Sequence, residues 1–86
     1  MARSEMLPSS ATQPSTSADM LLHLGMMYCL GLEVEQNYVT AHKWFNIAAL
    51  RGSREARHYR CEISREMTTR QIADAQRQAR AWIDLH

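Results

Sequence analysis

Histidine and cysteine are the residues of this chain best suited to metal binding or nucleophilic chemistry, and they are scattered. His58 and Cys61 stand three residues apart, so a helix would place them on one face. A metal site of these two residues with Cys29 would require the helices that carry them to be neighbours. The alternative is that the two cysteines are buried, reduced thiols acting as small apolar residues and that the histidines, such as His23 and His42, are partly exposed. We favour the alternative, and expect no metal, no cofactor and no catalytic residue.

Arginines are the second group of residues with potential chemistry, because a row of them could contact nucleic acid. Four lie at helical spacing in one segment: Arg54, Arg57, Arg60 and Arg65. Glutamates interleave with them: Glu55, Glu62 and Glu66. The formal charge of the chain is only +1, from ten basic and nine acidic residues. We therefore interpret the row as a solvated face of mixed charge and expect no nucleic-acid partner.

Length and composition limit the class of protein. The 86 residues suffice for one small domain, and 45% hydrophobic with 22% charged residues is close to the globular average. No apolar stretch approaches the roughly 20 residues that cross a bilayer, and the first residues lack an apolar signal-peptide core. Glycine-rich phosphate loops and His-Glu-x-x-His motifs are absent from the sequence. We expect a cytoplasmic, non-enzymatic protein with no membrane partner.

The elements that position these residues are predicted to be helices. Residues 1–16 are rich in Ser, Thr and Pro and are predicted to form a flexible N-terminal tail. Apolar residues then recur at helical spacing, and Gly31 and Gly52 can end helices in a left-handed conformation. The predicted helices cover residues 18–30, 38–50, 54–67 and 69–85. Their predicted N-caps are Ser17 or Thr16, Asn37, Ser53, and Thr68, the last with Gln71 in a capping box.

A dense motif runs through the first two predicted helices. It reads Leu24-Gly25-Met26-Met27-Tyr28, then Gly31, then Ala41-His42-Lys43-Trp44-Phe45-Asn46-Ile47-Ala48-Ala49, then Gly52. This motif resembles the Sel-one-like repeat, a family of helical hairpins related to tetratricopeptide repeats. Glu33 departs from the pattern, because the family usually has a second glycine there, so this turn could be tighter, strained or differently routed.

The resemblance implies an all-α fold of two helical hairpins, a short solenoid-type array of four helices. Residues 17–52 form the well-matched repeat within the domain of residues 17–86. Residues 53–86 match only through Ala56, Ala79 and Trp82, and are expected to form a degenerate capping repeat. The general role implied by the family is the binding of other proteins, without catalysis.

Gly25 is predicted to mark a close crossing of two helices. A glycine inside a helix costs about 0.8 to 1.0 kcal/mol relative to alanine, so its position implies a packing gain. Small residues opposite it, such as Ala41 and Ala48, would allow that approach, and Phe45 would fill the space around it. These are structural roles, and most of the motif is expected to specify packing.

The first helix is apolar nearly all round, although an edge helix should have a polar outer face. We expect its outer face to bind another protein or a second copy of the chain. The residues assigned to this role are Met20, Met26, Met27 and Leu30. One alternative is that Met6 and Leu7, or the third helix, cover this face. The other is that the chain is a small metal- or ligand-binding regulatory protein using Cys29, His58 and Cys61.

Overall fold

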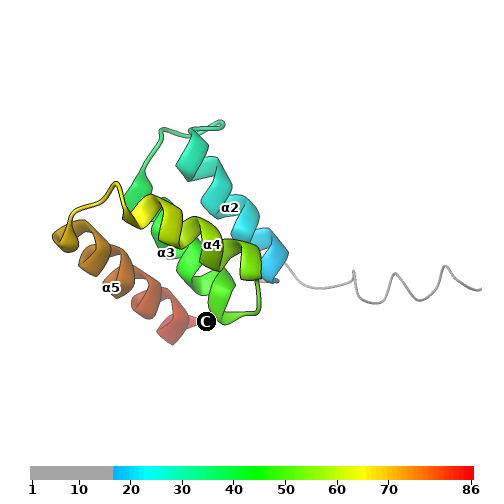
Figure 1. The fold of residues 1–86 in the computed structure, drawn as a ribbon. Helices are drawn as coiled ribbons and strands as arrows, with labels where there is room; N and C mark the ends of the chain where they lie inside the picture. Colours follow the sequence, from blue (N-terminus) through cyan, green and yellow to red (C-terminus); the bar gives the residue numbers. More distant parts are fainter. Residues whose placement is uncertain (1–16) are drawn as a thin grey trace, which may run out of the picture.

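The computed structural model describes residues 17–86, which form four α-helices and contain no strand (Figure 1). The helices are α2 (Ala18–Leu30), α3 (Tyr38–Leu50), α4 (Arg54–Ser64) and α5 (Thr69–Leu85). The predicted all-α fold with four helices is confirmed. The tail predicted for residues 1–16 lies outside the described residues, as do Met6 and Leu7.

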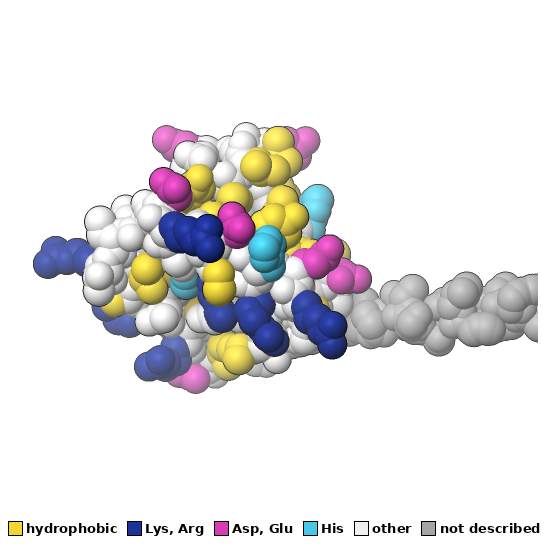
Figure 2. Space-filling view, viewed as in Figure 1, with side chains coloured by type: hydrophobic (Ala, Val, Ile, Leu, Met, Phe, Trp, Pro, Cys, Tyr) yellow, Lys and Arg dark blue, Asp and Glu magenta, His cyan; other side chains and the backbone are white. Residues whose placement is uncertain are grey.

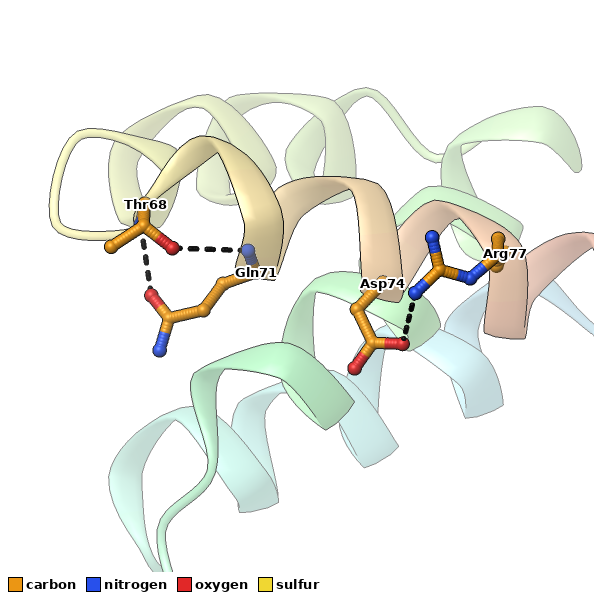
Figure 3. Close-up of polar contacts among 4 residues, drawn as sticks. All are labelled: Thr68, Gln71, Asp74 and Arg77. Carbon is orange, nitrogen blue, oxygen red and sulfur yellow. Dashed lines mark hydrogen bonds and ion pairs between the residues drawn. The ribbon is translucent and has the colours of Figure 1, made fainter.

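Each helix begins at a predicted cap. The side-chain oxygens of the caps accept hydrogen bonds from backbone N–H groups three residues on, at 3.0 to 3.2 Å: Ser17 from Met20, Asn37 from Thr40, Ser53 from Ala56, and Thr68 from Gln71. The Thr68 N–H in turn donates to Gln71 Oε1 at 2.8 Å, completing the capping box (Figure 3). Local sequence alone fixes these four starting points, because each cap satisfies an otherwise unpaired N–H group.

The end of α4 differs from the prediction. The helix was predicted to reach residue 67, but it ends at Ser64. The next three N–H groups, from Arg65 to Met67, bond to carbonyl groups three residues back, which tightens the chain into turns. Met67 then packs against the core, and Thr68 is free to start α5 in an extended conformation.

Helix α3 is the central element. Helix α2 packs along it as an antiparallel neighbour, and α4 and α5 also pack on it, with α2 and α5 on opposite sides (Figure 1). Helices α4 and α5 contact each other only slightly, and α2 touches α4 over a few residues. The buried residues of the last two helices, Ala56, Ile63, Ala75 and Ala79, are mostly small. These narrow apolar stripes are wide enough to pack α4 and α5 against α3. They leave little apolar surface for α4 and α5 to pack against each other as a hairpin.

The motif residues build the core around α3. Fully buried positions include Ala41, Phe45 and Ala48. Other motif residues pack against this cluster while partly exposed: Leu24, Tyr28, Trp44, Ala49 and Trp82. The rings of Trp44 and Trp82 meet edge-on at 5.5 Å between centroids, which joins α5 to α3. The ring of Phe45 stacks on Tyr59 of α4 at 5.6 Å.

Gly25 lies directly against the ring of Phe45. A β-carbon added at Gly25 would lie 2.5 Å from both Cδ1 and Cε1 of that ring, well inside van der Waals contact. Phe45 is itself completely buried, so its ring has no space into which it can retreat. The predicted close crossing at Gly25 is therefore present, and Phe45 is the residue that requires it.

The turn after α2 contains two left-handed residues. Gly31 has φ 72° and lets the Leu32 N–H donate to the Met27 carbonyl at 2.9 Å, a Schellman-type end. Glu33 has φ 65°, in the region that favours glycine. The turn thus keeps a glycine-like backbone at Glu33 and is strained there.

Replacing Gly25 with alanine is expected to lower the free energy of unfolding by about 1 to 3 kcal/mol, because the new methyl group overlaps the Phe45 ring. Alanine is the better helix former, so propensity and packing oppose each other. Urea denaturation measures the change. In a Phe45→Leu background the cost of Gly25→Ala should shrink, and an equal cost in both backgrounds would contradict the contact.

Replacing Glu33 with glycine is expected to raise the free energy of unfolding by about 1 kcal/mol, because a left-handed conformation strains any residue with a β-carbon. Glu35→Gly in the same turn is the matched control, since Glu35 has a negative φ and should gain nothing. Thermal and urea denaturation of both variants measure the difference. Equal effects at the two positions would show that the turn is unstrained.

Candidate functional site

The outer side of α2 carries exposed apolar residues. Met20 is 48% exposed and Leu30 57% exposed, while Met27 is half-buried. Met26 differs from these three, because it packs against the core cluster and belongs to the inner side of the helix. Leu32, in the turn that follows α2, is 50% exposed and belongs to the outer surface instead of Met26. We call Met20, His23, Met27, Leu30 and Leu32 the α2 face.

A hollow of about 430 Å³ lies at the end of the α2 face. It is lined by His23 and Met27 from α2 and by Gly31, Leu32 and Glu33 from the turn. One helix and one turn form its whole lining, so it has no opposing wall that could enclose a small molecule. Its shape suits a side chain of another protein better than a buried ligand.

Backbone hydrogen bonds fix the turn that completes this face. Besides the bond from Leu32 to the Met27 carbonyl, the Asn37 N–H donates to the Tyr28 carbonyl at 2.9 Å. The Gln36 side chain donates to the Cys29 carbonyl at 3.1 Å. The carbonyl groups of Met27, Tyr28 and Cys29 near the end of α2 are thereby satisfied, and Leu32 is held beside Met27. The α2 face is preorganised.

The charged side chains are unevenly distributed around this face. Residues 17–50 contain one lysine against three carboxylates, Asp19, Glu33 and Glu35, whereas residues 51–86 contain eight arginines against five carboxylates. In Figure 2, the side chains at the end of the molecule where α2 joins α3 include acidic ones and hydrophobic side chains gather over α2, while Lys and Arg gather over the opposite half, with some acidic side chains among them. The molecule is therefore dipolar although its net charge is small.

The cysteines and histidines do not form a metal site. Both cysteines are unpaired thiols, but the expectation that both are buried is wrong, because Cys29 is half-buried and Cys61 lies exposed on the outer side of α4. His58 instead contacts Glu62 one turn along α4, at 3.5 Å. Within residues 17–86, no group of three or more His, Cys, Asp or Glu side chains could hold a metal ion. The alternative of a Cys29, His58 and Cys61 site is thus not supported, because α2 and α4 approach each other over only a few residues.

The arginines of α4 and Arg65, which caps its C-terminus, form the mixed-charge face that was predicted. Arg54, Arg57 and Arg65 are exposed among the glutamates. Arg60 differs, because it is half-buried and its Nη1 donates to Asn46 Oδ1 on α3 at 2.8 Å. This arginine therefore serves helix packing.

A buried histidine is the polar feature that sequence reasoning missed. His42 is only 2% exposed. The Ser64 hydroxyl donates to the Arg60 carbonyl at 2.7 Å, so its oxygen is left to accept from His42 Nε2–H at 3.0 Å. That tautomer leaves His42 Nδ1 buried without a hydrogen-bond partner. The sequence did contain a signal for this burial. His42 lies in the motif between Ala41 and Phe45, so its side chain is expected to be buried where it points toward α4.

Burial lowers the pKa of His42, and the positive charge of Arg60 lowers it further. Burial also raises the pKa of the Cys29 thiol. Both shifts favour the neutral form, and neither residue lines the hollow on the α2 face. These groups are therefore poor candidates for a nucleophile or a general base acting there.

Comparison with protein-family models, with curated proteins and with solved structures gives no match for this chain. No helix in the described part combines the length and the apolar character needed to cross a membrane.

The burial of His42 predicts that the protein is less stable in acid. Because its pKa is lowered in the folded state, the unfolded chain binds the proton more tightly, and the free energy of unfolding falls as the pH drops below about 6.5. The loss stops growing below the folded-state pKa. Urea denaturation at a series of pH values should show this fall.

His42→Gln should flatten the pH dependence, because glutamine keeps an amide donor for Ser64 and does not titrate. The matched control is His23→Gln, at an exposed position, which should leave the slope unchanged. An unchanged slope in His42→Gln would mean that other groups cause the acid sensitivity.

Proposed function

We propose that this protein is a non-enzymatic interaction module that binds another protein chain through the α2 face. The observation that carries the proposal is an apolar outer side on an edge helix, uncovered by any other element of residues 17–86. A large apolar patch is unusual on a monomer and often marks a binding site. The two methionines of this face have flexible, polarizable side chains that adapt to a partner surface.

Burial of this face would supply the binding energy. Each Å² of apolar surface removed from water contributes about 25 cal/mol, before the costs of association are subtracted. Those costs are reduced here, because capping and turn hydrogen bonds already hold α2 and Leu32 in place. Little conformational entropy of this protein would therefore be lost on binding.

The chemistry of the described residues supports a role without catalysis. The two groups with shifted pKa values are His42, which solvent barely reaches, and Cys29, whose thiol is held more firmly protonated. A catalytic site requires such groups to share a concave pocket. Here the hollow and the shifted groups are in different places.

The resemblance to Sel-one-like repeats supports the same proposal, because partner binding is the general role of that family. The motif residues pack as such a hairpin would require, with Gly25 at the crossing of α2 and α3. We also propose a cytoplasmic location, where thiols stay reduced, which agrees with the unpaired Cys29 and Cys61.

Site-specific photo-crosslinking tests this function. A photoreactive amino acid placed at position 30 of the full chain should give a discrete crosslinked species in cells, because Leu30 lies on the α2 face. The same amino acid at position 61 is the matched control, since Cys61 is exposed on α4.

The expected crosslink should also disappear when Met27 is changed to glutamate in the position-30 protein. Circular dichroism should show that this variant keeps its helices. Equal crosslinking from positions 30 and 61, or none from either, would contradict a docking role for the α2 face.

A further inference from the structure

A second surface lies between α3 and α5. This groove has a volume of about 290 Å³ and is lined by Asn46, Leu50, Gln76, Ala79, Arg80 and Ile83. Leu50 is 69% exposed at one side, and Ile83 is partly exposed on the other helix. Because Arg60 of α4 donates to Asn46 Oδ1, the side chain of Asn46 is held in place.

The charged residue that lines the α3–α5 groove is basic. Arg80 lines it, and within residues 17–86 this guanidinium has no carboxylate partner, although Asp84 lies one turn away on α5. Arg77 differs, because it is paired with Asp74 at 2.9 Å (Figure 3). An occupant of the groove should therefore offer apolar side chains beside a carboxylate.

The α2 face has that chemistry. Its hollow is lined by Met27 and Leu32 together with Glu33, and the exposed Glu35 follows in the same turn. The two surfaces are thus complementary in charge and are both partly apolar. They also lie on opposite sides of α3, because α2 and α5 pack on opposite sides of that helix (Figure 1).

We propose that the partner of the α2 face is the α3–α5 groove of a second copy of this chain, in a head-to-tail arrangement. This inference rests on the function proposed above and names its partner. Each copy keeps one free surface after pairing, so further copies can add in the same way.

A symmetric pair of α2 faces is the competing arrangement, and the charges oppose it. Such a pair would bring Glu33 and Glu35 of both copies into one interface, with no lysine or arginine on the α2 face to offset them. Like charges brought together in an interface repel and weaken the association. The head-to-tail arrangement instead places these carboxylates against the half of the molecule that contains Arg80.

Two variants block the two surfaces separately. Leu30→Lys puts a positive charge on the α2 face, at an exposed position near the C-terminus of the helix, where a cation is tolerated. Arg80→Glu reverses the charge of the groove at an exposed position. Cys61→Lys, on α4 outside both surfaces, is the matched control. If either blocking variant fails to fold, Met20→Lys or Leu50→Glu replaces it.

Sedimentation of the full chain over a concentration series gives the readout. The unmodified protein and Cys61→Lys should show a weight-average mass that rises with concentration. Each blocking variant alone should remain monomeric, with a dissociation constant raised about tenfold or more. An equimolar mixture of the two should form a one-to-one pair, because one retains the α2 face and the other retains the groove.

Three results would overturn the head-to-tail arrangement. A mixture that stays monomeric would show that the two surfaces do not bind each other. Self-association of Arg80→Glu alone would indicate the symmetric pair. A monomeric unmodified protein at all concentrations would exclude a second copy as the partner, while crosslinking from position 30 to another protein would leave the proposed function intact.

Discussion

The contact between Gly25 and the Phe45 ring is the constraint on which the rest of the structure depends. It sets how closely α2 approaches α3, because even one methyl group would overlap the ring. Phe45 also stacks on Tyr59, so the same ring locates α4. A small core cannot absorb a displaced aromatic ring, since protein interiors are packed as densely as organic crystals. Two helix crossings are therefore coupled through one side chain.

The dependence on α3 explains how so small a chain keeps four helices together. Helices α4 and α5 make little contact with each other, and each gains its stability from α3. Their own buried residues are mostly alanine, which brings the backbones close but buries little apolar area. The larger contribution comes from aromatic pairs that α3 supplies, Phe45 with Tyr59 and Trp44 with Trp82. The outer surfaces of α2 and α5 remain open as a result.

Capping residues and helical spacing predicted the helices well, but they predicted the packing between helices less well. The starts of all four helices could be predicted because Ser17, Asn37, Ser53 and Thr68 satisfy N–H groups of their own helices. The end of α4 could not, because it depends on Met67 reaching the core. The outward position of Met20 and Leu30 followed from helical spacing, whereas the inward packing of Met26 depends on where neighbouring helices lie. The burial of His42 likewise depends on where α4 packs against α3. The α3–α5 groove arises only where α5 packs against α3.

The attachment of α5 to a single neighbour has a consequence for motion. A helix held by one partner can separate from it while the other helices stay packed, so α5 can open as a unit and leave the α2–α3–α4 contacts in place. Four of the six residues that line the groove belong to that unit: Gln76, Ala79, Arg80 and Ile83. Any occupant of the groove also contacts α3, so it bridges the two helices and suppresses this opening. Occupancy would thus slow amide exchange throughout α5, far beyond the residues that it touches.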